Sequence, residues 1–266
     1  MALQTGQHLD EWLEFAKGLV AESRKLLASR SDWRSRFKLD RTLVTQLDLD
    51  IERRLVERIL QRYPDHGVLG EEFGARARDA EWLWVLDPID GTASFMAGMP
   101  VYGTLIALLH QGVPVLGVID QPATDECWIG CQGRPTQLFN RDGRHQCRTR
   151  ACADLAQAFV SVSSPDFFQP DEQPVLQGFR QRSGWRVYGG ACRSYGLLAS
   201  GRTDLALDAG LKLYDYAAMR PIVEGAGGMI SDWEGRPITL DSDSRVLAAG
   251  DPARHREALE LIQQLA

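Results

Sequence analysis

The sequence predicts a layered α/β (α+β) fold of two lobes, residues 1–145 and residues 146–266. Three observations support this fold class. Helical periodicity covers the start of the chain, short apolar runs typical of strands follow, and helices then alternate with strands to the C-terminus. The stretch 132–150 is rich in glycine, arginine and other polar residues, and we expect the lobes to meet there.

The first lobe begins with two amphipathic helices. Apolar residues recur at helical spacing over 9–27 and again over 49–60, and the second helix ends before Pro64. The polar residues 30–41 predict a loop between these helices. Residues 68–74 predict a short strand that ends in a loop.

A group of predicted strands follows. The continuous apolar run 82–86 is typical of a buried strand, 104–109 and 113–120 predict a hairpin with its turn at Gln111-Gly112, and 127–130 predicts a further strand. The second lobe alternates between strands at 158–162, 185–188, 205–208, 229–233 and 246–249 and helices at 173–182, 192–200, 214–225 and 254–265.

Composition narrows the functional classes. The net charge is -6 with no long basic run, so we expect no nucleic-acid partner. Five cysteines with no C-x-x-C pair argue against a disulfide framework and against a thiolate zinc site. We see no basic start followed by an apolar segment and no run of membrane-spanning length, so we expect a soluble cytoplasmic protein that does not engage membranes.

The strongest local signal is the motif Asp87-Pro88-Ile89-Asp90-Gly91-Thr92, directly after the strand 82–86. Two carboxylates three residues apart across a proline, whose φ is fixed, can converge on one point. Gly91 allows close backbone approach, and Thr92 is placed to begin a helix whose first N–H groups suit a phosphate. Carboxylates beside phosphate-binding amides need a cation between them, and Mg²⁺ with oxygen ligands fits that need.

Four further acids support the same site, although each has an ordinary structural interpretation. Glu71 and Glu72 end a strand, where paired acids usually belong to a solvated loop. Asp48 precedes a helix, where the usual role of an aspartate is to cap it, and Asp215 has the same interpretation. A metal site explains all of these acids with a single cause.

With these motifs taken together, the sequence resembles the inositol monophosphatase superfamily over nearly its whole length. The resemblance rests on LVTQLD at 43–48, GEE at 70–72, WVLDPIDGT at 84–92, YD at 214–215 and GAGG at 225–228. It implies a layered αβαβα sandwich and a Mg²⁺-dependent phosphomonoesterase that binds two or three Mg²⁺ ions per site. Dimers are common among similar proteins, so a homodimer is expected.

The resemblance also implies ligands for the ions. Glu71, Asp87 and the carbonyl group of Ile89 would hold one Mg²⁺, and Asp87, Asp90 and Asp215 would hold a second. A third, weaker ion would lie near Glu71. Two such ions about 3.5–4 Å apart polarise phosphoryl oxygens and stabilise a leaving alkoxide.

Catalytic roles follow from the same resemblance. Thr92, with help from Asp48, would orient a metal-activated water, and Glu71 would belong to the same catalytic group. The amides of Gly91 and Thr92 would bind the phosphate, and Glu72 would tune a ligand or the water. No covalent phospho-enzyme is implied.

The C-terminal half resembles the histidinol-phosphatase branch of this superfamily. Tyr214 precedes the metal-binding Asp215, Pro221 lies inside the next helix, and EGAGG at 224–228 and Asp232-Trp233 follow. This pattern favours L-histidinol phosphate, a substrate of histidine biosynthesis. Asp208 would contact the alcohol part of the ester.

One segment departs from that branch. The branch usually continues Asp-Cys-Tyr after two glycines, whereas this chain has Ala191-Cys192-Arg193. The alanine is more like the inositol phosphatases, while Arg193 would favour an anionic group or lie on a solvated helix face. myo-Inositol 1-phosphate is therefore the main alternative substrate, and a 3′-phosphoadenosine nucleotide or a non-catalytic regulatory role are further alternatives.

Overall fold

The computed structural model describes residues 2–29, 35–37 and 43–265. Its α-helices are α1 (Ala2–Ala28), α2 (Gln46–Arg62), α3 (Thr92–Met96), α4 (Gln173–Arg182), α5 (Arg193–Ala199), α6 (Leu213–Tyr216), α7 (Met219–Gly225) and α8 (Pro252–Leu265). Its strands are β1 (Ser35–Phe37), β2 (Leu43–Thr45), β3 (Gly67–Gly70), β4 (Gly74–Arg76), β5 (Trp82–Asp90), β6 (Gly103–His110), β7 (Val113–Gln121), β8 (Glu126–Cys131), β9 (Gln137–Asn140), β10 (Gly143–Gln146), β11 (Phe159–Val162), β12 (Trp185–Tyr188), β13 (Leu205–Asp208), β14 (Met229–Ser231) and β15 (Val246–Ala249).

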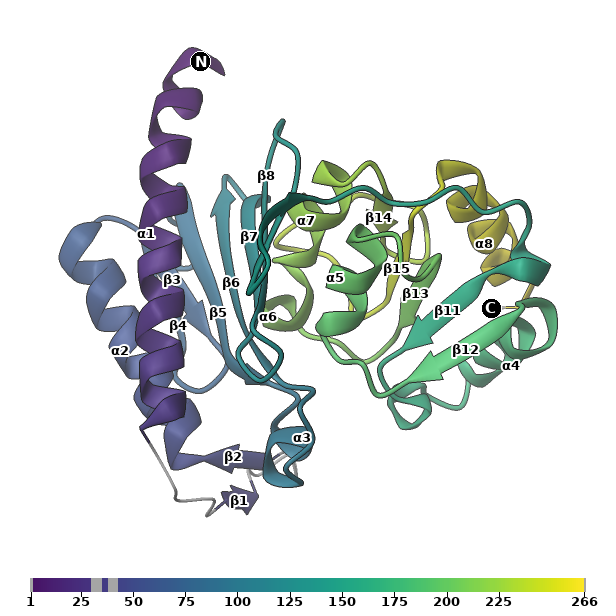
Figure 1. The fold of residues 1–266 in the computed structure, drawn as a ribbon, viewed down its shortest axis with the longest axis horizontal. Coiled ribbons are helices and arrows are strands. Elements are labelled where there is room, and N and C mark those ends of the chain that lie inside the picture. The colour runs from purple at the N-terminus through teal and green to yellow at the C-terminus, as the bar shows by residue number, and fades with distance from the viewer. Residues whose placement is uncertain (1, 30–34, 38–42, 266) are drawn as a thin grey trace.

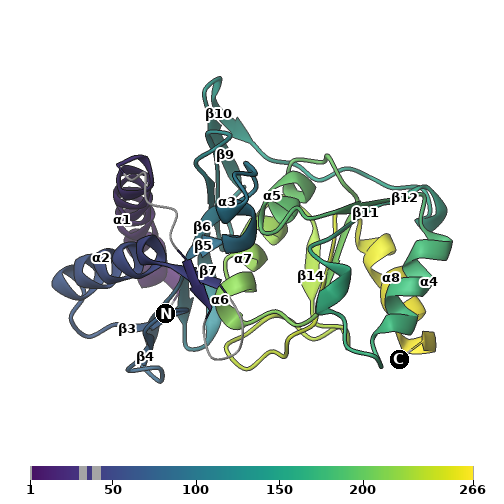
Figure 2. The ribbon, with the colours of Figure 1, turned by 90° about the horizontal axis from the view of Figure 1, so that it is seen from below.

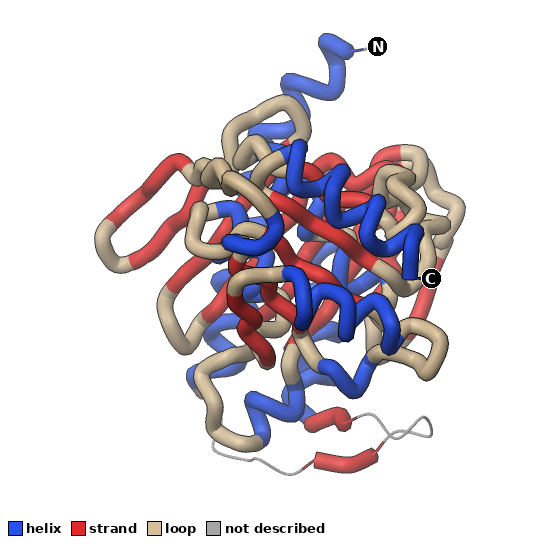
Figure 3. Tube along the Cα trace, turned by 90° about the vertical axis from the view of Figure 1, so that its right-hand side faces the viewer, coloured by secondary structure: helices blue, strands red, loops and turns tan. Residues whose placement is uncertain are grey.

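These elements form five layers in the order αβαβα, which confirms the predicted fold class (Figure 1). Helices α1 and α2 cover one face of an eight-stranded sheet. Helices α5, α6 and α7 lie between that sheet and a five-stranded sheet, as Figure 2 also shows. Helices α4 and α8 cover the outer face of the second sheet and cross in front of its strands in Figure 3.

The eight-stranded sheet has the order β10-β9-β8-β7-β6-β5-β3-β4. Its neighbours pair antiparallel except β3 and β5, which are parallel. Gly70 pairs with Leu86 at the end of this parallel ladder, so the residues that follow both strands meet at one edge of the sheet. This register brings the Glu71-Glu72 loop to the motif that begins at Asp87.

The five-stranded sheet has the order β12-β11-β13-β15-β14. β11 runs parallel to β12 and β13, and β15 runs antiparallel to β13 and β14. The segments after β11 and β13 therefore leave the sheet at the same end, as expected for parallel neighbours.

Three hydrophobic cores hold the layers together. Ile51 and Leu55 of α2 pack on the outer face of the large sheet, and Trp128 and Ile222 belong to the core between the two sheets. The third core joins α4 and α8 to the small sheet. The middle layer packs closely, because a Cβ atom on Gly117 of β7 would lie 2.0 Å from a carbonyl oxygen beside α7.

The observed elements differ from the prediction in several places, including the following three. The polar stretch 132–150 contains the hairpin β9–β10, which pairs at the edge of the large sheet. The helix predicted at 214–225 is divided into α6 and α7, because Pro221 has no N–H to continue the helical hydrogen bonds. β5 runs on from Leu86 to Asp90, so the predicted proline turn lies inside a strand.

Other predictions about the chain have mixed outcomes. Residues 30–34 and 38–41 of the predicted loop lie outside the described residues, and the residues between them form β1. All five cysteines are unpaired. None of the helices in the described ranges combines the length and apolar character that membrane crossing requires. The division into lobes at residue 145 stays a prediction.

Candidate metal and phosphate site

The site lies where the ends of both sheets meet the middle helices. A cavity of about 540 Å³ opens there. Its walls come from the ends of β3, β5, β11 and β13 and from the segment before α5. The predicted site residues that line it are Glu71, Asp90, Gly91, Ala191 and Asp215. Segments far apart in the sequence therefore build a single concave site.

A bulge in β5 aims the two motif aspartates. Asp87 pairs with Leu105 of β6 and Asp90 pairs with Gly103, so three steps along β5 match two steps along its neighbour. The extra residue locally disrupts the ladder and re-aims side chains. Pro88 fits at this position because a bulge does not need its missing N–H.

Asp215 completes a carboxylate cluster with these two residues. One carboxylate oxygen from each of Asp87, Asp90 and Asp215 lies within 4.8 Å of the other two. Asp215 stands at the start of α6, where its Oδ2 accepts a hydrogen bond of 2.6 Å from the backbone N–H of Lys212. Lys212 is therefore the N-cap of α6, and Asp215 is the third residue of the helix in a capping box.

The electrostatics of this cluster fit a cation. Burial raises the pKa of Asp87 well above its usual range, and the nearby charges of Glu71, Asp90 and Asp215 raise it further. Oδ1 of Asp87 is buried, and no described residue donates a hydrogen bond to it. A buried carboxylate oxygen without a donor is costly unless a cation pairs with it. All the ligand atoms are oxygens, which suits Mg²⁺.

Asp48 combines a structural role with proximity to the cluster. Thr45, not Asp48, is the N-cap of α2, and Asp48 is the third residue of the helix in a capping box. Its Oδ2 accepts a hydrogen bond of 2.7 Å from the Thr45 N–H, while its buried Oδ1 has no donor among the described residues. Burial raises the pKa of Asp48, and the charge of Glu71 adds to that effect.

The turn at Gly91 links the cluster to the first turn of α3. Gly91 has φ 79°, in the left-handed region, and a Cβ atom there would lie 2.8 Å from the carbonyl oxygen of Val101. Thr92 follows, and its Oγ1 donates a hydrogen bond of 2.9 Å to the carbonyl oxygen of Ile89. The first N–H groups of a helix have no partner inside it, so they face outward at this turn.

Asp208 is buried below the cavity surface rather than exposed in it. Its exposed fraction is 1%. Its carboxylate accepts hydrogen bonds from the backbone N–H of Ser163 at 2.7 Å, from the Ser163 hydroxyl at 3.1 Å and from the Tyr195 hydroxyl at 2.9 Å. Burial raises the pKa of Asp208 to about 7. Ser163 lines the cavity, so its contact with Asp208 links this buried carboxylate to the cavity.

Ala191 lines the cavity, whereas Arg193 is not among its lining residues. Ala191 lines the cavity with φ 45°, a left-handed conformation that aspartate tolerates better than alanine. Arg193 belongs to α5, and its guanidinium donates two hydrogen bonds to Oε2 of Glu126, at 2.9 and 2.6 Å. Arg193 is therefore engaged by an acid of β8.

Several residues of the site were missed in the sequence. Cys192 lines the cavity and donates its backbone N–H to Asp90, and Phe167 and Lys212 also line this cavity. Glu52 is fully buried in α2 and accepts hydrogen bonds from the Glu71-Glu72 loop. The sequence does carry one signal for Glu52, a charged residue between apolar positions on the buried face of a helix.

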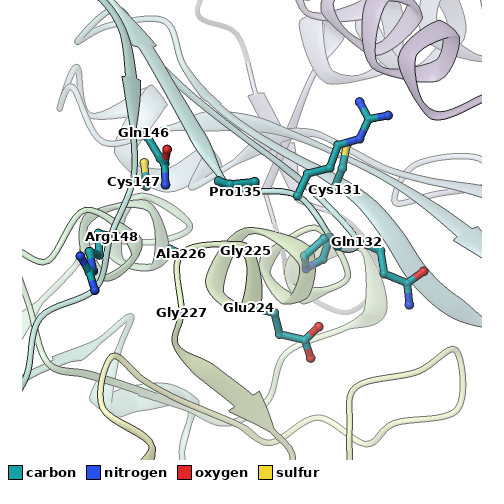
Figure 4. Close-up of a pocket in the computed structure, with 13 residues that line it drawn as sticks. Cys131, Gln132, Pro135, Gln146, Cys147, Arg148, Glu224, Gly225, Ala226 and Gly227 are labelled. Atoms are coloured by element: carbon teal, nitrogen blue, oxygen red, sulfur yellow. The ribbon is translucent and has the colours of Figure 1, made fainter. Parts of the chain in front are cut away.

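A second cavity of about 520 Å³ lies beside α7 and the start of the β9–β10 hairpin (Figure 4). Cys131, Gln132, Cys147, Arg148 and Glu224 are among the residues that line it. It contains none of the predicted site residues. Because its lining has one carboxylate side chain, it lacks the acid cluster that distinguishes the first cavity.

The chain is similar to known proteins over most of its length. A model of the inositol monophosphatase family matches residues 8–266. The bifunctional phosphatase IMPL2, chloroplastic, of Arabidopsis thaliana is 40% identical over 96% of this chain and 76% of that protein. A histidinol-phosphatase of Chlorobaculum parvum is 35% identical over 79% of this chain and 80% of that protein. An inositol monophosphatase structure from Zymomonas mobilis has a TM-score of 0.85 at 36% identity, covering 96% of this chain and 98% of that one.

Proposed function

The chain belongs to the inositol monophosphatase family, a family of metal-dependent phosphatases, and we propose that it is a Mg²⁺-dependent phosphomonoesterase whose substrate is L-histidinol phosphate. The observation that carries the proposal is the cluster of Asp87, Asp90 and Asp215, two of which line the cavity. Its buried, donor-free oxygen on Asp87 supports cation binding.

The proposed ligands are the three clustered aspartates, Glu71 and the carbonyl oxygen of Ile89. That carbonyl accepts a hydrogen bond from Thr92 and retains a second lone pair for an ion. When bound, Mg²⁺ supplies positive charge that offsets the carboxylates, polarises the phosphoryl group and lowers the pKa of water. Two or three ions per site are proposed.

The remaining roles belong to the protein's own groups. Thr92 donates its only hydroxyl hydrogen to the carbonyl oxygen of Ile89. Its hydroxyl oxygen can therefore accept a hydrogen bond from a water and so orient it. The donor-free Oδ1 of Asp48 would take up the proton that this water loses, while Thr92 would only accept a hydrogen bond from it. The amides of Gly91 and Thr92 would bind the phosphate, and Glu72, which is half-buried beside Glu71, would tune the ligands.

Two residues that line the cavity, Ser163 and Phe167, support histidinol phosphate as the substrate. The hydroxyl hydrogen of Ser163 points to Asp208, so Ser163 offers lone pairs to an N–H or O–H donor of the substrate. Phe167 is 47% exposed and lines the same cavity, where a flat imidazole ring can pack on its ring. A histidinol-phosphatase among the relatives agrees with this choice.

The main alternative is myo-inositol 1-phosphate, which Ala191 favours. Among the described residues, the carboxylates that line the cavity are Glu71, Asp90 and Asp215, all proposed metal ligands, so this part of the chain offers no further acid there to a cationic group. The solved inositol monophosphatase among the similar proteins is consistent with this alternative. A cytoplasmic homodimer is proposed in either case.

Phosphate release from a panel of esters tests the proposal. The panel contains histidinol phosphate, inositol 1-phosphate, fructose 1,6-bisphosphate and 3′-phosphoadenosine 5′-phosphate, each with Mg²⁺ and with EDTA. We expect metal-dependent release that is fastest from histidinol phosphate. Ala191→Asp, which places an acid in the cavity, should raise the preference for histidinol phosphate over inositol 1-phosphate. A large preference of the unaltered protein for the cyclitol ester would refute the substrate assignment.

A further inference from the structure

Glu52 is a buried charge with two backbone partners. It lies four residues after Asp48 on the same face of α2, and its exposed fraction is 0%. Its Oε2 accepts a hydrogen bond of 2.8 Å from the N–H of Glu72, and its Oε1 accepts one of 2.9 Å from the N–H of Phe73. Glutamate is rarely fully buried unless it is paired, and here it is paired with the turn that follows Glu71.

Gly70 allows this carboxylate to approach the turn. A Cβ atom on Gly70 would lie 1.9 Å from Oε1 of Glu52 and 2.2 Å from its Cδ. Any other residue at this position would therefore displace the carboxylate or the strand. On its other side the turn is tied to β5, because the N–H of Glu71 donates a hydrogen bond of 3.2 Å to the carbonyl oxygen of Leu86.

These contacts fix the turn from two directions. The bond to Leu86 sets where β3 ends beside β5, directly before Asp87. The two bonds to Glu52 set the path of the chain after Glu71, whose side chain lines the cavity with Asp90 and Asp215. The direction of the Glu71 side chain depends on the backbone at both of its neighbours, and Glu52 fixes one of them.

We propose that Glu52 is a positioning residue for the metal site: its carboxylate holds the turn at Glu72 and Phe73 so that Glu71 reaches the ion beside Asp87. This inference rests on the proposed function, because it takes Glu71 as a metal ligand. Glu52 itself touches neither substrate nor ion in this account. Its effect is on the affinity for metal, through the direction of Glu71.

Glu52→Gln tests the role of the carboxylate. A glutamine has one acceptor oxygen and an NH₂ group, so it would present a donor to one of the two backbone N–H groups. Loss of partners that orient metal ligands typically costs about 10–100-fold in metal affinity, and we expect a fall of that size. The measurement is Mg²⁺ binding by calorimetry, alongside the Mg²⁺ concentration that half-saturates phosphate release. The matched control is Glu57→Gln, on the exposed face of the same helix, which should bind Mg²⁺ as the unaltered protein does.

Gly70→Ala separates the effect of the position of the Glu52 carboxylate from the effect of its negative charge. It keeps the charge of Glu52 but pushes its carboxylate away from the turn, so it too should weaken Mg²⁺ binding. In a Glu52→Ala background the added methyl group meets no carboxylate, so Gly70→Ala should then have little further effect. Thermal unfolding of each variant without metal checks that it is folded. If a variant is not folded, Glu52→Asp takes its place, because it keeps the charge but withdraws the carboxylate from both backbone amides.

The outcomes separate this inference from the proposed function. Weakened Mg²⁺ binding in both Glu52→Gln and Gly70→Ala, with non-additive effects, supports the positioning role. Unchanged Mg²⁺ binding in both variants overturns it, and so does a Gly70→Ala variant that binds normally while Glu52→Gln does not, because charge alone would then explain the loss. If the unaltered protein binds Mg²⁺ but releases phosphate from no ester, the proposed function fails while the binding data still decide the role of Glu52.

Discussion

The backbone N–H of Cys192 donates a hydrogen bond of 2.7 Å to Oδ2 of Asp90. Asp90 ends β5 in the eight-stranded sheet, whereas Cys192 lies directly before α5, in the half of the chain that forms the five-stranded sheet. The two residues are 102 positions apart. An acid of the cluster is therefore oriented by the other half of the molecule, so the site is complete only when both sheets have packed on the middle helices.

The first prediction concerns the turn at Gly91. Gly91→Ala places a side chain at positive φ and against the carbonyl oxygen of Val101, whereas Gly98→Ala places one at φ 73° with no atom within 4 Å. Both variants should lose about 1–2 kcal/mol of unfolding free energy from the left-handed backbone. Only Gly91→Ala should also lose activity, on the order of 100-fold, because the turn beside Asp90 must shift.

Urea unfolding and phosphate release of the two variants check this prediction. Gly98→Ala is the control, since it carries the same backbone strain at a residue that does not line the cavity. Equal losses of activity in both variants would show that strain, rather than the geometry at Gly91, matters.

The second prediction concerns Arg193. Its guanidinium is bound by Glu126, so Arg193→Gln and Glu126→Gln should behave as partners in a double-mutant cycle for unfolding, with a coupling of about 1 kcal/mol or less. Neither change should alter KM for the monoester. If Arg193→Gln alone raises KM while Glu126→Gln does not, Arg193 contacts the substrate and the ion pair is incidental.

The third prediction concerns the pH dependence of stability through Asp208. Burial raises its pKa from 3.8 to about 7, so between these values the folded protein keeps a proton that the unfolded chain has released. The free energy of unfolding contributed by this group therefore falls as pH rises from about 4 to about 7 and is constant above that range. Asp208→Asn removes this dependence.

This pH dependence is measured by urea unfolding of the unaltered protein and of Asp208→Asn at pH 5 and pH 8 in EDTA. The stability of Asp208→Asn relative to the unaltered protein should increase between these pH values by up to about 3 kcal/mol, because about two pKa units of the shift lie above pH 5. Other titrating groups are common to both proteins and cancel in the comparison. A difference in stability that does not change with pH would contradict the raised pKa.

Much of the fold was predictable because its signals are local. The continuous apolar run at Trp82, the helical periodicity of α2 and the turn at Gln111-Gly112 each determine one element, and each was predicted close to its observed place. The hairpin β9–β10 was missed because β10 is exposed along its whole length, so its polar residues show no alternation between a buried and an exposed face.

The acids of the candidate site were predictable from the sequence, but the contacts that hold these acids in place were not. The motif from Asp87 to Thr92 and the acids Glu71 and Asp215 stand out by residue type, and the structure brings Asp87, Asp90 and Asp215 together. The bulge in β5, the bond from Cys192 to Asp90 and the burial of Asp208 depend on contacts between distant segments. No local pattern records such contacts.

The most direct test of the account compares Asp90→Asn with Asp142→Asn in metal-dependent phosphate release. Asp90 belongs to the carboxylate cluster, whereas Asp142 is an exposed residue in the turn between β9 and β10. We predict that Asp90→Asn lowers turnover by more than about 100-fold at saturating Mg²⁺ without changing the circular dichroism spectrum, since a lost ligand costs more than a lost partner of a ligand. Asp142→Asn should keep full activity that EDTA abolishes. Normal turnover by Asp90→Asn, or release that persists in EDTA, would contradict the metal-dependent mechanism.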